Sequence, residues 1–377
     1  MHRPPSIRVA SGGAVRTDGR TAKLAAHVRS PGQVERVRAF VDGRPAVDRL
    51  VCSADADVAL DVPVPAGESR VALVAYDSEG LSSNPVLVDV ESKRAGARPA
   101  LWVVAVGVSR YPGLGPEQQL EVADDDARAL AEAFGAQAGQ GKRFERAHVE
   151  TILDSDVTPE RVLGALAGVA KAAPDDLVVV FLAGHGVTLP EGGMVFLTSR
   201  ATPKADVARR EGIGWTELQG ALDKVPARVV VLLDACHSGH VSTERVAPNE
   251  LLARDLAARG KSGVLVFAAA RGAQLSYEVS GPSAAPGASS SRGLELAWDG
   301  APRLAKPLGP AGHGLFTSAL LEALAGEAVD RDGSGAIELG ELVDYVTERV
   351  RASSNGKQTP WVARREMFGD FAVARPR

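Results

Sequence analysis

Short apolar stretches separated by turn residues fill the first part of the chain, to about residue 90. Residues 38–41 run directly into Asp42-Gly43, a dipeptide typical of β-hairpin turns, and apolar positions alternate again beyond it. Residues 71–76 and 86–90 have the same character. Short strands at this spacing predict a small all-β sandwich.

The hydrophobic pattern changes beyond a polar, turn-prone segment. Four continuous apolar runs follow, with helical patterns between them, one of which begins at Thr158-Pro159. Unbroken Val/Leu strands alternating with amphipathic helices predict an α/β domain with a mostly parallel sheet covered on both faces. Active sites in such sheets collect at the carboxyl ends of the strands. The four runs are Leu101–Val108, Leu177–Leu182, Val229–Leu233 and Val264–Ala270.

This change of pattern divides the 377 residues into two expected domains. We expect a β-sandwich over residues 1–92, a linker over 93–100 and the α/β domain over 101–377.

Composition adds exclusions to this picture. The chain has 43 Lys and Arg against 47 Asp and Glu, and its net charge of −4 argues against a dedicated nucleic-acid binder or a polybasic membrane-surface protein. No apolar run reaches the roughly 18–20 residues that span a bilayer, and the first residues lack the apolar core of a signal peptide. The two cysteines, Cys52 and Cys236, are far apart, which excludes a disulfide framework and favours a reducing, cytoplasmic location.

Reactive side chains follow two of the predicted strands. The run over 177–182 ends in Ala-Gly-His185-Gly, and the run over 229–233 ends in Asp-Ala-Cys236-His-Ser-Gly. A thiol is a good nucleophile when ionised, and a nearby imidazole supplies the base. Taken singly, such a cysteine is usually a small buried residue and Gly-His-Gly is usually a turn. Their joint occurrence at two strand ends favours a Cys-His dyad.

These motifs resemble those of the caspase-like cysteine peptidases (C14 type), and more closely their metacaspase branch with its prokaryotic relatives. His185 and Cys236 are 51 residues apart, close to the spacing of about 50 known for caspases. Residues 234–239 have the D-x-C-H-S-G form typical of metacaspases, while residues 102–111 and 314–317 match an opening strand and a late helix start. The likeness extends from about residue 101 to residue 351.

The resemblance implies a cysteine-type endopeptidase that acts on protein substrates and needs no cofactor for its chemistry. Cys236 would be the nucleophile and His185 the general acid/base, with the oxyanion held by the backbone N–H groups of Gly186 and Cys236. His237 matches a family position that has no catalytic assignment. Basic residues after the nucleophile are expected sites of zymogen processing: Arg245, Arg254, Arg259 and Lys261.

Acidic residues near the predicted dyad indicate the specificity. Asp234 precedes Cys236 by two residues, so strand alternation places both on one face, where a carboxylate attracts a cationic P1 side chain. The resemblance implies that this Asp forms the S1 pocket with Asp126, the last residue of an acidic triplet. Acidic residues also favour a helix N-terminus through its dipole, which is the role expected of Asp124 and Asp125. The predicted cleavage therefore follows Arg or Lys.

Residues 330–341 fit the twelve-residue EF-hand loop position by position, and helical patterns flank them. Gly335 provides the sharp turn. A single loop of this kind can keep its shape without an ion, so two alternatives stay open: a Ca²⁺ site, with or without control of catalysis, and an empty loop. The predicted ligands are Asp330, Asp332, Ser334, the carbonyl of Ala336, Glu338 and Glu341.

The sequence thus predicts a caspase-like endopeptidase preceded by an immunoglobulin-like module. Residues 71–83 resemble the late hairpin of bacterial immunoglobulin-like modules, and a docking role for a protein partner is expected there. Regulation by proteolytic processing, Ca²⁺ or a partner is expected, with no nucleic-acid or membrane partner. The alternatives are a catalytically inactive caspase fold serving as a calcium-responsive scaffold, and a CHAT-type protease with the same dyad and another specificity. The motifs around Asp234 and in the first strand favour the metacaspase-like branch.

Overall fold

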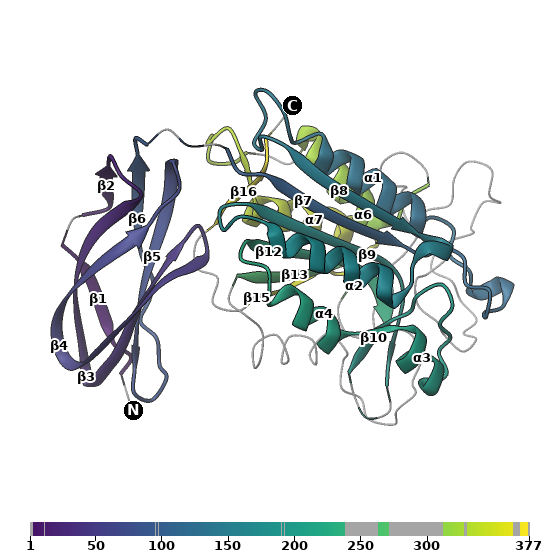
Figure 1. Ribbon diagram of the computed structural model, residues 1–377, viewed down its shortest axis with the longest axis horizontal. Helices are drawn as coiled ribbons and strands as arrows, with labels where there is room; N and C mark the ends of the chain where they lie inside the picture. The colour runs from purple at the N-terminus through teal and green to yellow at the C-terminus, as the bar shows by residue number, and fades with distance from the viewer. Residues whose placement is uncertain are drawn as a thin grey trace. The chain divides into compact units, whose positions relative to one another are not determined.

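The computed structural model divides into two compact units, residues 1–98 with 366–371 and residues 99–365 with 372–377 (Figure 1). For Cys236, His237 and Glu327 the backbone alone is described. The residues that the structure describes are 3–10, 12–94, 96, 98–189, 191, 193–237, 263–270, 312–327, 330–364 and 370–375.

The first unit is all-β, as the alternating pattern predicts. Its strands pair in one sheet of order β1-β3-β5-β6-β2, with β4 alongside β3. The long strand β3 pairs with β1 over residues 26–29 and with β5 over residues 34–41, and its register against β4 shifts between these two parts. The strands are β1 (Ser6–Val9), β2 (Ala14–Thr17), β3 (Thr21–Val41), β4 (Arg44–Pro63), β5 (Gly67–Asp77) and β6 (Val86–Ser92).

A large apolar core holds this unit together. Residues from both halves of β3, such as Leu24 and Val37, join Leu73 of β5 in the same buried cluster, each no more than 2% exposed. A smaller buried cluster contains Phe40 of β3 and Val74 of β5. Alternate residues of each strand supply the core because successive side chains point to opposite faces.

The predicted hairpin at Asp42-Gly43 is confirmed. Strand β3 ends at Val41 and β4 begins at Arg44, and the two turn residues have φ angles of 46° and 81°. Positive φ at both positions is the conformation of the tight hairpin turns for which this dipeptide is typical. The Asp42 carboxylate also accepts the backbone N–H of Arg70 (2.7 Å), which ties the turn to β5.

The second unit contains the mostly parallel sheet that the four apolar runs predict. Its parallel strands lie in the order β8-β7-β9-β12-β13, and β15 (Trp361–Arg364) pairs antiparallel with β13. β10 (Met194–Phe196) pairs antiparallel with the end of β9 and with β11 (Ile213–Gly214). The parallel strands are β7 (Leu101–Gly107), β8 (Ala147–Leu153), β9 (Leu177–Thr188), β12 (Arg228–His237) and β13 (Val264–Ala268).

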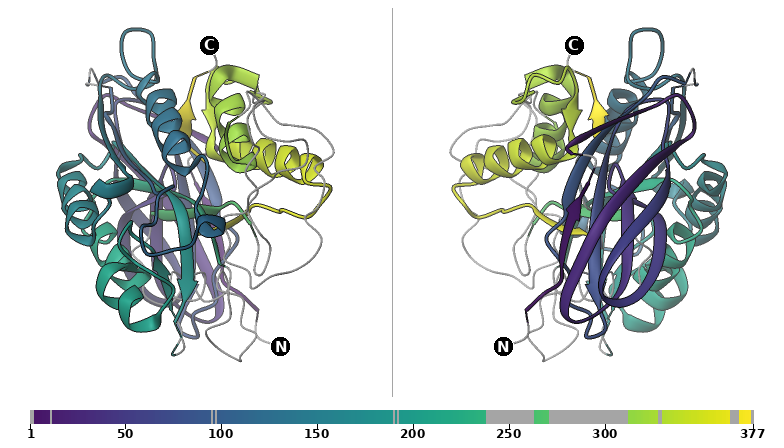
Figure 2. Two further views of the ribbon diagram at one scale, coloured as in Figure 1. Left: turned by 90° about the vertical axis from the view of Figure 1, so that its right-hand side faces the viewer. Right: turned by 90° about the vertical axis from the view of Figure 1, so that its left-hand side faces the viewer.

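Helices cover both faces of this sheet (Figure 2). α1 (Ala123–Gly135) joins β7 to β8, and α2 (Pro159–Gly168) joins β8 to β9. Because β8 and β9 lie on opposite sides of β7, right-handed crossovers place the two helices on opposite faces. α1 packs beside α6 (Leu315–Glu322), α6 beside α7 (Leu339–Ser353), and α2 beside α4 (Trp215–Leu222).

Shorter elements complete the unit. The small strand pair of β14 and β16 joins the segment before α7 to the last described strand. In the part of the chain that the structure describes, no helix is long and apolar enough to cross a membrane. The remaining elements are η1 (Pro116–Gln118), η2 (Asp154–Asp156), η3 (Val169–Lys171), α3 (Ala205–Glu211), η4 (Ala323–Glu327), β14 (Ile337–Glu338) and β16 (Ala372–Ala374).

Candidate active site

The predicted dyad residues lie at the carboxyl ends of two adjacent parallel strands. In the register of β9 and β12, Cys236 is directly opposite His185. Neighbouring strands are about 4.8 Å apart, so the backbone brings together two residues that are distant in sequence. Gly186, predicted for the oxyanion site, follows at the position opposite His237.

His185 is only 2% exposed and contacts the loop that follows β7. Its Nε2 lies 2.7 Å from the carbonyl oxygen of Gln118, and its backbone N–H donates to the hydroxyl of Tyr111 (2.8 Å). The two rings are 4.8 Å apart between centroids. Because a carbonyl oxygen can only accept, Nε2 carries the proton in the neutral imidazole and Nδ1 is the basic nitrogen.

Gly184 shows why a glycine precedes this histidine. Its φ is 157°, and a Cβ added there would lie 2.7 Å from the Tyr111 hydroxyl and 3.1 Å from the Phe196 ring. Only glycine, which has no Cβ, lets the tyrosine reach the backbone of His185.

The two predicted S1 carboxylates reach the same turn of one helix. Asp126 is fully buried, its Oδ1 lies 2.7 Å from Nδ1 of His313, and its oxygens accept the backbone N–H of Gly314 (3.2 and 3.3 Å). Asp234 is also fully buried and accepts a hydrogen bond from the Thr317 hydroxyl (3.3 Å). The N-terminal end of α6, from the preceding His313 to Thr317, therefore brings the two carboxylates into one neighbourhood.

The three aspartates at the start of α1 lie in different environments. Asp125 is exposed and pairs with Arg128 (2.5 Å), while Asp124 accepts a hydrogen bond from the Ser109 hydroxyl (2.5 Å). Asp126 alone of the three is fully buried and contacts the segment before α6. The structure thus distinguishes Asp126 from its two neighbours.

Several groups around the site had no role predicted from the sequence. Tyr111 and Thr317 lie within the matching motifs, and that was the one signal available for them. The Gln118 group that meets His185 is a backbone carbonyl, which every residue carries. His313 is 187 positions from Asp126, and no local pattern links the two.

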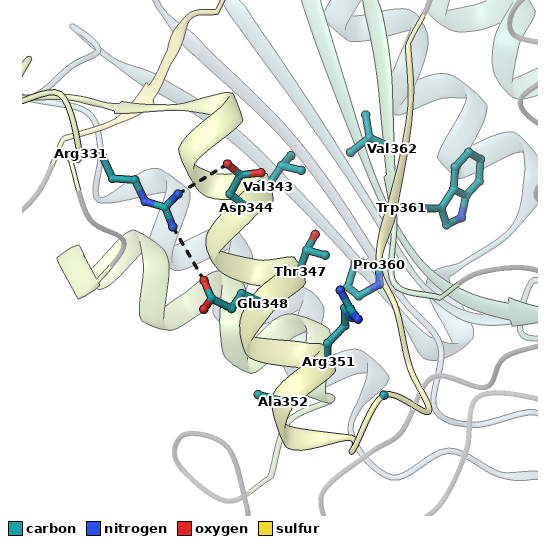
Figure 3. A pocket seen from close by; sticks show the side chains of 11 residues that line it. Arg331, Val343, Asp344, Thr347, Glu348, Arg351, Ala352, Pro360, Trp361 and Val362 are labelled. Atoms are coloured by element: carbon teal, nitrogen blue, oxygen red, sulfur yellow. Dashed lines mark ion pairs between the residues drawn. The ribbon is translucent and has the colours of Figure 1, made fainter.

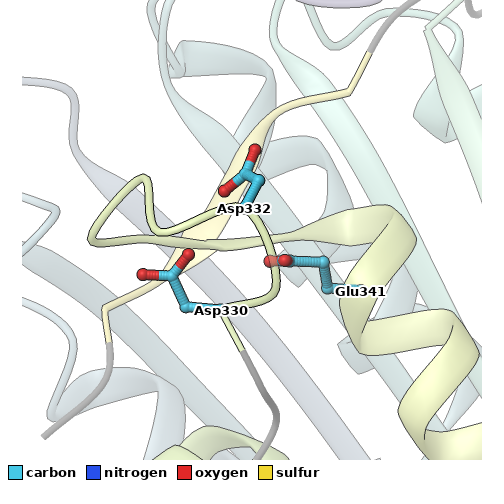
Figure 4. Close-up of side chains that lie close together, drawn as sticks. All are labelled: Asp330, Asp332 and Glu341. Carbon is cyan, nitrogen blue, oxygen red and sulfur yellow. The ribbon is translucent and has the colours of Figure 1, made fainter.

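The predicted calcium loop, residues 330–341, runs into the first turn of α7. One oxygen each of Asp330, Asp332 and Glu341 lies within 4.8 Å of the others (Figure 4). Gly335 has a φ of 77°, which permits the sharp turn that the motif requires. The pairing of β14 with β16 holds the second half of the loop. A set made only of oxygens suits a hard cation such as Ca²⁺.

The other predicted ligands lie in the hydrogen-bond network of the same loop. The Ser334 hydroxyl donates to Glu338 (2.9 Å) and to the carbonyl of Ala336 (3.4 Å). Burial, together with a hydrogen bond to Glu341, raises the pKa of Glu338 to about 7. Burial opposes ionisation of Glu341, but hydrogen bonds from Glu338 and from the backbone of Glu338 and Arg331 lower its pKa.

A separate cavity of about 740 Å³ lies between α7 and β15 (Figure 3). Arg331 at its edge forms ion pairs with Asp344 (3.7 Å) and Glu348 (3.8 Å). The described residues that line it include Thr347 and Trp361, and His185, Asp126 and Asp234 are not among them.

The solved structures that match the chain have low similarity to it. The fibronectin(III)-like modules of Clostridium thermocellum CbhA are 20% identical, with 24% of this chain and 48% of that chain covered and a TM-score of 0.20. A Jonesia denitrificans lytic polysaccharide monooxygenase is 16% identical, with 21% of this chain and 56% of that chain covered and a TM-score of 0.19. The human OSCAR ligand-binding domain is 20% identical, with 31% of this chain and 61% of that chain covered and a TM-score of 0.19. The chain thus covers about half the length of these structures.

Comparison with protein families concerns the second unit. No curated protein matches the chain. The caspase domain, a peptidase family (C14), matches residues 100–372. This match extends over well more than half of the chain, from just before β7 to the start of β16. The chain therefore belongs to the caspase domain family.

Proposed function

We propose that the chain is a cysteine endopeptidase that hydrolyses peptide bonds after Arg or Lys. Membership of a peptidase family implies protein substrates. The observation that carries the proposal is the strand register that places Cys236 opposite His185, together with the hydrogen bond from His185 Nε2 to the Gln118 carbonyl.

The proposed mechanism uses His185 Nδ1 as the base. This nitrogen takes the thiol proton of Cys236, and the thiolate attacks the scissile carbonyl carbon. As the C–N bond breaks, the imidazolium gives its proton to the leaving amine, and a thioester remains on the cysteine. Water, deprotonated by His185, hydrolyses the thioester, and a proton returns to the sulfur. The backbone N–H groups of Gly186 and Cys236 would stabilise the oxyanion. Removal of one such donor typically lowers kcat about 10²–10³-fold.

The proposed preference for a cationic P1 residue rests on the environment of Asp126 and Asp234. Both carboxylates are fully buried, and the described hydrogen bonds to them come from the start of α6 and the two residues before it. A buried carboxylate needs compensating donors, and a guanidinium supplies two in a planar fork. A P1 Asp would add a third carboxylate to the same neighbourhood.

Two fluorogenic peptides that differ only at P1 test this proposal. Wild-type protein is expected to cleave the P1-Arg peptide and leave the P1-Asp peptide intact, and Cys236→Ala to lose at least about 10³-fold in rate. Preference for P1 Asp would reject the S1 assignment. No cleavage by wild type, with or without Ca²⁺, would favour the inactive scaffold.

Self-processing is examined by incubating wild type and Cys236→Ala and identifying the fragments by mass spectrometry. Cleavage restricted to wild type and located after basic residues supports both the activity and its P1 preference. Cleavage that persists in the variant indicates a contaminating peptidase. The predicted processing sites, Arg245, Arg254, Arg259 and Lys261, lie outside the described residues.

A second proposal is that residues 330–341 bind Ca²⁺. The convergence of Asp330, Asp332 and Glu341 supports it, and the Gly335 turn has the backbone conformation that the motif needs. Ser334, the carbonyl of Ala336 and Glu338 would complete the oxygen ligands. The ion would supply no chemistry for peptide hydrolysis; it would neutralise the acidic loop at the start of α7.

A further inference from the structure

The side chain of Gln119 links several parts of the loop between β7 and α1. Its Oε1 accepts the backbone N–H of Tyr111 (2.7 Å), and its Nε2 donates to the carbonyl of the same residue (2.9 Å). Nε2 also lies within hydrogen-bond distance of the carbonyls of Leu114 and Gly115, at 3.2 Å each. The amide thus adds to the backbone hydrogen bonds of the loop, such as that from Leu114 N–H to the Tyr111 carbonyl (3.0 Å).

Two groups of this loop contact His185. The Tyr111 hydroxyl accepts the backbone N–H of His185, and the Gln118 carbonyl lies within hydrogen-bond distance of Nε2 of the imidazole. The Gln119 side chain forms hydrogen bonds with the backbone of Tyr111. The Gln118 carbonyl belongs to the planar peptide unit that includes the nitrogen and Cα of Gln119. Fixing the Gln119 side chain therefore helps to fix both of these groups.

We propose that Gln119 is a positioning residue for His185, acting through Tyr111 and the Gln118 carbonyl. The inference rests on the proposed function, in which Nδ1 of His185 must face the thiol. A displacement of about 1 Å at a reacting group can cost about 10²-fold in rate. Loss of the amide removes the hydrogen bonds of Gln119 to Tyr111, Leu114 and Gly115 and lets the carbonyl and the tyrosine move.

The variant that tests this is Gln119→Glu, which keeps the size and one acceptor but removes the Nε2 donor. The matched control is Gln137→Glu at a buried glutamine that accepts the Arg375 N–H (3.0 Å) and donates to the Leu324 carbonyl (3.5 Å). Both are made in a Cys52→Ser background, because Cys52 is an exposed free thiol and the chain has two cysteines. Alkylation by iodoacetamide then reports Cys236 alone.

Four quantities are measured: kcat per alkylatable thiol and KM for the P1-Arg peptide, the rate of Cys236 alkylation at pH 7, and Tm. For Gln119→Glu we expect kcat per reactive site to fall about tenfold to hundredfold, KM to stay within about twofold, and alkylation to slow about tenfold. For Gln137→Glu we expect a lower Tm with turnover per reactive site unchanged.

A purely structural role for Gln119 would lower Tm and the number of reactive sites, but not the turnover of each remaining site. Equal losses of turnover per site in the two variants would overturn the proposal. If Gln119→Glu does not fold, Tyr111→Phe replaces it, because this variant removes only the hydroxyl that accepts from His185. We expect it to lower kcat about fivefold to tenfold, and unchanged turnover would then overturn the proposal.

The design separates this inference from the proposed function. If wild-type Cys236 is alkylated rapidly but the P1-Arg peptide is not cleaved, the proposed specificity fails, and slower alkylation in Gln119→Glu still supports the positioning role. If wild-type Cys236 reacts no faster than a free cysteine, both the dyad and its positioning residue are rejected.

Discussion

The dyad region and the acidic loop are assembled in opposite ways. The dyad region draws on segments that are far apart in sequence, and the sheet brings them together at the ends of β9 and β12. The acidic loop takes its oxygens from residues 330–341, and a two-residue strand pair with β16 is its long-range support. The first arrangement depends on the packing of the whole unit, whereas the second depends mainly on local chain geometry. Changes in the sheet should therefore damage catalysis and leave ion binding largely intact.

Gly184→Ala is expected to give the largest difference between the two regions, a loss of peptidase activity with Ca²⁺ binding retained. The new methyl group would lie 2.7 Å from the buried Tyr111 hydroxyl, so either the tyrosine or the backbone at His185 must move. We expect a loss of about 1–3 kcal/mol in the free energy of unfolding and at least about 10²-fold in kcat/KM for the P1-Arg peptide. Affinity of the acidic loop for Ca²⁺, measured by calorimetry, should stay within about twofold.

Gly164→Ala is the matched control for this change. Gly164 lies in α2 with open space around its Cβ position, so alanine there should be neutral or stabilising by up to about 1 kcal/mol. If Gly184→Ala keeps its peptidase activity, or loses Ca²⁺ binding together with activity, the two regions do not differ in the way described.

Asp234→Asn should affect specificity more than stability. The asparagine oxygen can still accept the hydrogen bond from Thr317, but the negative charge for the P1 cation is lost. We expect kcat/KM for the P1-Arg peptide to fall about 10²-fold, with the larger part in KM. The control is Asp125→Asn, at an exposed carboxylate paired with Arg128, and it should change kcat/KM less than twofold. An equal effect of the two variants would remove Asp234 from the proposed pocket.

The fold could be read from the sequence where one residue pattern specifies one element. Unbroken Val/Leu runs gave β7, β9, β12 and β13 because a strand buried on both faces needs apolar residues on both. The hairpin at Asp42-Gly43 was predictable because few dipeptides accept positive φ at both positions.

The surroundings of the candidate active site could not be predicted in the same way. The Gln118 carbonyl acts through backbone, and the Gln119 amide forms its hydrogen bonds within an irregular loop. The contact between Asp126 and His313 depends on how α6 packs beside α1, which no local spacing encodes. The acidic loop was easier to identify because the spacing of its ligands is itself the motif, whereas the pairing of β14 with β16 was not foreseen.

Glu341→Gln tests the local character of the acidic loop. This carboxylate is one of the three that converge, and its loss should raise the Kd for Ca²⁺ at least about tenfold in calorimetric titration. Glu348→Gln serves as the control, because that exposed carboxylate pairs with Arg331 outside the converging set. If Ca²⁺ controls catalysis, Glu341→Gln also raises the Ca²⁺ concentration that cleavage requires. An unchanged requirement rejects the regulatory role and leaves the binding proposal standing.

The smallest expected effect is the change in Tm caused by Glu338→Gln in the Ca²⁺-free protein. Its pKa is about 7 in the folded protein against 4.5 for an ordinary Glu, because burial and the hydrogen bond to Glu341 disfavour its charged form. Between pH 4.5 and 7 the folded state therefore binds more protons than the unfolded state, and stability falls as pH rises through this window. Glu338→Gln removes that loss, so its Tm should exceed that of wild type above pH 7 and match it near pH 4.

The gain of Glu338→Gln in the free energy of unfolding above pH 7 should stay below about 1 kcal/mol, because solvent screens a carboxyl group that is only partly buried. Added Ca²⁺ should reverse the order of the two proteins above pH 7, since Glu338 is a proposed ligand and glutamine binds the ion more weakly. A difference in Tm that does not change with pH would show that the carboxyl group ionises normally. A difference that Ca²⁺ leaves unchanged would remove Glu338 from the proposed ligand set, while the three converging carboxylates would still be tested by Glu341→Gln.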